Sequence, residues 1–181
     1  GEMGINLSGA THEAIAYEPS IVVSRLDGSV LYADEGEDVR EGAPPPHTGG
    51  RFGEFANPRP EDPPTIRVDV EGLNSASTAV AGLSRRLISD YHGTPHNFRS
   101  SALTFNPGTR VPAFSTHAPI EFYVVGGSFE INGKIAQAGS FCIVEAGAQV
   151  HLSSPHGAFL LAWSEAPVQW LDCDAPDIFG F

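Results

Sequence analysis

The sequence predicts an all-β protein, folded as a small barrel or sandwich, on three observations. Short apolar segments recur from residue 65 onward, and turn sequences separate them. Glycine (20 residues) and proline (15 residues) are frequent in a chain of 181 residues. Short strands joined by tight turns are typical of barrels and sandwiches, and a chain of this length can bury a core of its own.

The predicted strands follow one another with turns between them. Residues 66–70 alternate apolar and polar side chains, as a half-buried strand does. Further strands are predicted at residues 83–91, 101–105, 120–125, 129–131, 141–144 and 158–163, and turns at 106–108, 126–127, 132–133, 138–139 and 156–157. Residues 74–83 are ambiguous, and a helix is the alternative there. No repeat relates two halves of the chain, so a duplicated barrel is not expected.

Residues 1–64 differ in composition from the rest. They hold 12 of the 22 acidic residues and several proline clusters, and proline cannot donate to the interior of a sheet. One β-hairpin is predicted, in which residues 21–24 and 29–32 flank an Asp-Gly turn. We therefore predict an irregular, proline-rich acidic arm over residues 1–64 and a barrel over residues 65–181.

Composition also argues against several classes of partner. The formal net charge of -12 repels nucleic acid and anionic membranes, and no run approaches the ~18–20 apolar residues that cross a bilayer.

Cys142 and Cys173 are too few for a disulfide framework, and Cys142 lies in an apolar run that suggests a small buried side chain. The beginning of the chain has no secretory signal, so we expect a cytoplasmic protein without nucleic-acid or membrane partners.

Two glycine-framed segments stand out within the predicted barrel. The first runs from Gly108 through His117 and Glu121, and the second runs from Gly139 to His151. Their order resembles the two motifs of the cupin superfamily (RmlC-like proteins), most closely the branch that includes the sensor domain of zinc-binding anti-sigma factors. The resemblance covers about half of the chain. It implies a single cupin double-stranded β-helix, which is a jelly-roll barrel.

The resemblance also implies a metal site, but this chain departs from the motifs at the ligand positions. Cupins place two histidines, a glutamate and a third histidine in the barrel lumen, where such ligands bind zinc, iron, manganese or nickel. Here Phe114 and Thr116 stand at the first two histidine positions and Val150 at the third. His117 and His151 each come one residue later, where a regular strand directs them to the opposite face.

Two functions therefore remain open. In one, bulges turn His117 and His151 inward, and together with Glu121 they hold one divalent metal for a dioxygenase or isomerase reaction.

In the other, the protein has no metal, and the lumen binds a small apolar or aromatic molecule. Its predicted lining is Phe114, Thr116, Tyr123 and Val150. We favour this interpretation, because a fold persists after its chemistry is lost.

A homodimer is also predicted, since residues 178–181 form an apolar Ile-Phe-Gly-Phe tail that is costly to leave in water. A sensor that controls a sigma factor is a third interpretation. It is disfavoured because residues 1–64 contain no recognisable helical partner-binding domain.

Overall fold

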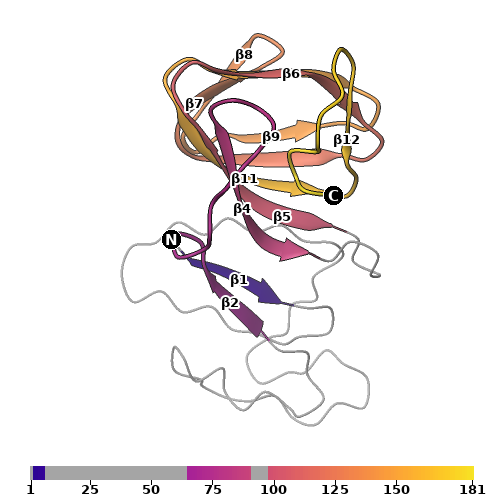
Figure 1. Cartoon of the computed structure of the whole chain (residues 1–181). Helices are drawn as coiled ribbons and strands as arrows, with labels where there is room; N and C mark the ends of the chain where they lie inside the picture. Colours follow the sequence, from indigo (N-terminus) through magenta and orange to yellow (C-terminus); the bar gives the residue numbers. More distant parts are fainter. Residues whose placement is uncertain (1, 7–64, 91–97) are drawn as a thin grey trace, which may run out of the picture. The chain divides into compact units, whose positions relative to one another are not determined.

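The computed structural model describes residues 2–6, 65–90 and 98–181, and it divides the chain into two units, Glu2–Val68 and Asp69–Phe181. The first unit contains a two-stranded sheet of β1 (Glu2–Asn6) and β2 (Thr65–Asp69) (Figure 1). A strand was predicted where β2 lies. The hairpin predicted over residues 21–32 lies outside the described residues.

All regular secondary structure in the described residues of the second unit consists of strands. These are β3 (Ala76–Ser77), β4 (Leu83–Asp90), β5 (Arg99–Phe105), β6 (Thr109–Thr116), β7 (Ile120–Ile131), β8 (Lys134–Gln137), β9 (Phe141–Val144), β10 (Gln149–Ser154), β11 (Ala158–Ser164) and β12 (Val168–Trp170). No helix occurs at residues 74–83, where β3 and a turn lie instead, so that alternative was wrong. Among the described residues no helix is long and apolar enough to cross a membrane.

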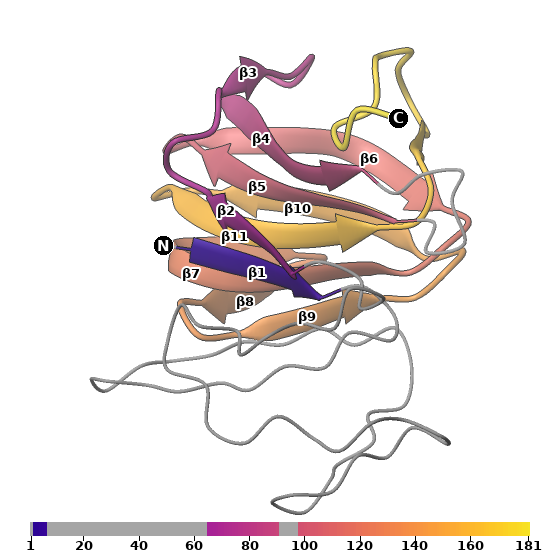
Figure 2. The ribbon, with the colours of Figure 1, turned by 90° about the horizontal axis from the view of Figure 1, so that it is seen from below.

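The strands form a curled antiparallel sheet, with the order β12-β6-β10-β7-β11-β5-β4-β3 and with β8 and β9 added alongside β7. Two layers result from the curl. One contains β4, β5, β11, β9 and the first part of β7, and the other contains β12, β6, β10, β8 and the last part of β7. Figure 2 shows β4, β5 and β11 side by side in the first layer. This arrangement is the predicted jelly roll.

Strand β7 is the element that joins the two layers. A turn was predicted at residues 126–127, but the strand continues through both glycines, so that prediction was wrong. Gly127 adopts a φ of 73°, and the register of β11 against β7 shifts beside it, between Phe159 and Leu160. Glycine permits such an irregularity inside a strand, and β7 changes its neighbours there. By contrast, Asn132 and Gly133 form the predicted turn, since both have positive φ.

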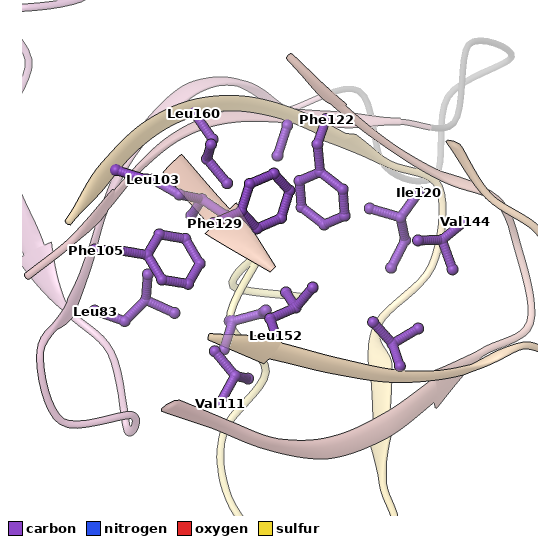
Figure 3. Close-up of a cluster of buried hydrophobic side chains, with 14 of the residues drawn as sticks. Leu83, Leu103, Phe105, Val111, Ile120, Phe122, Phe129, Val144, Leu152 and Leu160 are labelled. Carbon is purple, nitrogen blue, oxygen red and sulfur yellow. The ribbon is translucent and has the colours of Figure 1, made fainter. Parts of the chain in front are cut away.

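The core lies between the two layers and is almost wholly apolar. Figure 3 shows the rings of Phe105, Phe129 and Phe122 in a row between the strands. The carboxy-terminal segment adds two side chains to this core, because Ile178 and Phe179 are 0% exposed. The tail was expected to be covered by a partner subunit, but these two side chains are covered within their own chain, so they give no reason to expect a dimer.

Candidate functional site

The lumen positions of β6 and β10 hold apolar side chains. Phe114 lies opposite Val150 in the pairing of β6 with β10, and both are 0% exposed. Trp170 of β12 packs its ring edge-on against Phe114, with the ring centroids 5.9 Å apart. Two of the three positions where the cupin motifs carry histidine are thus part of a packed hydrophobic core.

The remaining histidine position of the motifs holds Thr116, whose hydroxyl already forms hydrogen bonds to the backbone. Its Oγ1 donates to the carbonyl oxygen of Ala118 at 2.9 Å and accepts from the Ala118 amide at 3.3 Å. These bonds close the turn between β6 and β7. The side chain is buried, so it serves the local backbone rather than an open binding position.

The burial pattern of strand β7 shows which side chain near the glutamate position of the motif faces the lumen. Ile120 and Phe122 are fully buried in the core, whereas Glu121 and Tyr123, between and after them, are only partly buried. Successive side chains of a strand point to opposite faces. Ile120 therefore faces the lumen, while Glu121 and Tyr123 lie on the outer face of the sheet. Tyr123 does not belong to the lumen lining in which it was expected.

The two candidate histidines also lie outside the lumen. His117 is exposed, and its Nε2 is 2.7 Å from the side-chain amide nitrogen of Gln169. The pairing of β10 with β6 does shift register between Val150 and Leu152, as a bulge at His151 requires. Even so, His151 is exposed, and its backbone N–H donates to Asn132 Oδ1 at 2.8 Å. The irregularity does not turn this imidazole inward.

The donor set of the lumen does not fit a divalent metal. The four side chains facing it at the motif positions are Phe114, Thr116, Ile120 and Val150, which together offer one hydroxyl. Transition metals in proteins require imidazole, thiolate or carboxylate donors. Within residues 2–6, 65–90 and 98–181, no three His, Cys, Asp or Glu side chains gather as a metal site would require.

Cys142 does not supply a reactive site in the core either. Both Cys142 and Cys173 are free thiols, so the chain has no disulfide between them. Cys142 is half-buried against the core, and this burial raises the pKa of its thiol above the usual 9.0. A raised pKa lowers the thiolate fraction at neutral pH, and the thiolate is the nucleophilic form. Cys142 is therefore a packing side chain, as its apolar run suggested.

Sequence reasoning missed three residues at one end of the lumen: Arg85, Ser101 and Phe179. Ser101 and Arg85 each bury a polar atom without a hydrogen-bond partner in the described part of the chain. Phe179 places its ring 6.5 Å from that of Phe122. A small residue in a predicted strand and a phenylalanine in an irregular tail carry no sequence signal of a shared site.

The geometry defines the class of protein: the chain has the cupin fold, a jelly-roll barrel whose metal-ligand positions carry phenylalanine, threonine, isoleucine and valine. Comparison with solved structures agrees with this fold. An acetylacetone dioxygenase from Acinetobacter johnsonii superimposes with a TM-score of 0.53 and 15% identity, covering 70% of this chain and 89% of that chain. The polyketide cyclase RemF from Streptomyces resistomycificus gives a TM-score of 0.51 and 15% identity, covering 63% and 89%.

An RmlC-like cupin from Shewanella frigidimarina NCIMB 400 also matches, with a TM-score of 0.47 and 18% identity over 58% of this chain and 90% of that chain. No protein-family model and no curated protein sequence matches the chain. At such identities the likeness concerns the fold alone.

Proposed function

We propose that this protein is a cupin that binds a small aromatic molecule in its barrel without a metal. The observation that carries the proposal is the replacement of ligating side chains by Phe114, Thr116, Ile120 and Val150, all of which are buried in the lumen. Small-molecule sites are lined mostly by apolar and aromatic side chains with a few polar groups among them. The lumen has such side chains, and its phenylalanine rings favour an aromatic ligand, which takes the place of side chains that pack there in its absence.

The metal-dependent alternative finds no support in the placement of its ligands. His117 and His151 are exposed, and Glu121 lies on the outer face of β7. A three-ligand site needs side chains that converge on one point. We therefore propose a binding protein rather than a dioxygenase or isomerase that uses these residues.

The test uses Trp170 as a reporter of the lumen, because its indole contacts Phe114. The chain has two tryptophans, so a Trp163→Phe variant leaves Trp170 as the single tryptophan, which is excited selectively apart from the tyrosines. Benzoate and toluene serve as aromatic probes and acetate as the non-aromatic control. We expect a saturable change in emission with an aromatic probe and none with acetate.

The matched control fills the lumen. A Val150→Phe substitution adds a ring at a fully buried position, and we expect it to weaken probe binding at least tenfold while circular dichroism shows an intact sheet. Emission that does not saturate with either aromatic probe, in protein that is folded, would contradict the proposed function.

We also propose a homodimer, now on the exposed apolar side chains of β7 and β9 instead of the tail. Val125, Phe141 and Ile143 are 45%, 46% and 57% exposed, and Phe141 and Ile143 point outward from the same strand. Light scattering at several protein concentrations tests it. An Ile143→Lys variant is expected to be monomeric, and a wild-type monomer at every concentration would refute the proposal.

A further inference from the structure

The carboxy-terminal segment completes the core from outside the regular strands. After β12, residues 171–181 form no strand, and the segment returns beside β12 (Figure 1). Its Phe179 extends the row of rings, in which Phe105 and Phe129 are 6.2 Å apart, Phe129 and Phe122 5.7 Å, and Phe122 and Phe179 6.5 Å. The last ring of this row is therefore the one that no strand ladder holds in place.

Among the described residues, a few polar contacts join this segment to the strands. They are Leu171 N–H to the Ala113 carbonyl (2.9 Å), Trp170 Nε1–H to the Ala175 carbonyl (2.8 Å), Val168 N–H to Asp177 Oδ1 (2.7 Å), Arg85 Nη1 to the Ile178 carbonyl (3.4 Å), and Arg99 Nη1 to the Gly180 carbonyl. Within the segment, Phe181 N–H donates to Asp177 Oδ2 (3.3 Å). The guanidinium of Arg99 also stacks 4.5 Å from the centre of the Phe181 ring. All are isolated contacts rather than part of a backbone ladder, so the segment can open while the sheet stays intact.

Two buried polar atoms lie where this segment meets the barrel. Ser101 is 0% exposed, and its Oγ has no hydrogen-bond partner among the described residues. Ser101 pairs with Ala162, and Ala162 pairs with Phe122, so all three share one level of the first layer. Ser101 has the same strand parity as the core residue Leu103, and its hydroxyl therefore points into the lumen.

The second atom is Nε of Arg85, which is also buried and unpartnered. Arg85 lies opposite Leu103 on the neighbouring strand, which makes it a diagonal neighbour of Ser101 at about 7–8 Å between backbones. Arg85 makes no ion pair within the described part of the chain. Buried polar groups are rarely left without a partner, because their lost hydration is then not replaced.

We propose that residues 177–181 are a displaceable plug over a site for a small aromatic carboxylate. This inference rests on the proposed function and names its ligand class and its gate. The ring of the ligand takes the place of Phe179 against Phe122. Its carboxylate accepts hydrogen bonds from Arg85 Nε and Ser101 Oγ, the two buried atoms that lack partners while the plug is seated and Arg85 Nη1 donates to the Ile178 carbonyl. A neutral ring fills the same space but leaves both polar groups unpaired, so the site discriminates against it.

The plug makes the apparent affinity depend on the fraction of open molecules. Two substitutions should raise this fraction in different ways. Gly180→Ala keeps every core side chain, but the residue has a φ of 79°, which an alanine adopts only with strain, so the seated plug loses stability. Phe179→Ala removes the ring that occupies the site.

The experiment is calorimetric titration of benzoate into the full chain, with toluene and acetate as comparison probes. We expect Gly180→Ala and Phe179→Ala each to bind benzoate at least tenfold more tightly than the wild type. Adding Ser101→Ala to Phe179→Ala should weaken benzoate about tenfold and leave toluene unchanged. Phe129→Ala is the matched control, since it removes a ring from the middle of the row and should not improve benzoate binding.

Hydrogen exchange separates this inference from the proposed function. Benzoate should speed exchange at the amides of Val168 and Phe181 in the wild type, because both donate to Asp177 in the seated plug. Benzoate binding that leaves these amides protected, with unchanged affinity in both variants, would overturn the plug but not the proposed function. Binding by Phe179→Ala alone would also overturn it, as an engineered cavity.

Two further outcomes are informative. No aromatic binding by wild type or either variant would overturn the inference and the proposed function together. Toluene bound as tightly as benzoate would overturn the assignment of a carboxylate to Arg85 and Ser101.

Discussion

Replacing Ile120 by alanine is expected to lower the free energy of unfolding by about 2–5 kcal/mol. The side chain is 0% exposed and lies beside that of Val144, its cross-strand partner on β9, at the edge of the core (Figure 3). Alanine removes three carbon atoms, and at ~0.8 kcal/mol for each buried methylene the lost transfer free energy is about 2.4 kcal/mol. The cavity that remains adds to this cost, because the surrounding strands relax only in part.

The matched substitution is Glu121→Ala, one residue further along β7. Glu121 is only partly buried and lies on the outer face, so we expect a change of about 1 kcal/mol or less. Urea denaturation followed by circular dichroism measures both, and equal slopes justify comparing the midpoints. If Glu121→Ala is as destabilising as Ile120→Ala, the assignment of Ile120 to the lumen is refuted. Glu121 would then again be a candidate ligand.

Three further predictions concern single positions. Gly127→Ala should be more destabilising than Gly133→Ala, because both glycines have positive φ but only at Gly127 would a Cβ clash with a neighbouring carbonyl oxygen; thermal denaturation compares them. Cys142 should react with iodoacetamide more slowly than exposed Cys173. Since burial raises the Cys142 pKa above 9.0 in the folded state, its contribution to stability holds below about pH 9 and is lost as pH rises through the folded pKa, which unfolding measured at several pH values tests. His151→Ala should leave the metal content of protein purified without chelator unchanged, and a stoichiometric metal lost in this variant would contradict the metal-free lumen.

The sequence by itself determined the fold class of the barrel. Regular spacing of apolar segments and turns predicted a barrel or sandwich, and the resemblance to the cupin motifs implied the jelly roll. The turn at Asn132-Gly133 formed as predicted because only particular residues adopt positive φ easily. The same reasoning failed at Gly126-Gly127, where two glycines allow a bend inside a strand as readily as a turn between strands.

The candidate site was predictable only where strand parity could be counted. Placing Phe114 and Val150 in the lumen required a fixed register from the glycine framework, and both are buried there. Strand parity also predicted that His117 and His151 face outward unless the strands bulge, and both are exposed. Parity could not decide whether Ile120 or Glu121 faces the lumen. The length of the loop before β7 decides which residues of that strand point inward, and the motif permits loops that differ by one residue.

Only the tertiary structure decided what lies at the end of the lumen. Arg85, Ser101 and Phe179 are up to 94 positions apart in the sequence and come from two strands and an irregular tail. Nothing local marks them, since a serine in a strand or a phenylalanine near a glycine has many uses. Their meeting depends on how the curled sheet brings β4 and β5 against the segment after β12, and that long-range packing is a property of the folded chain alone.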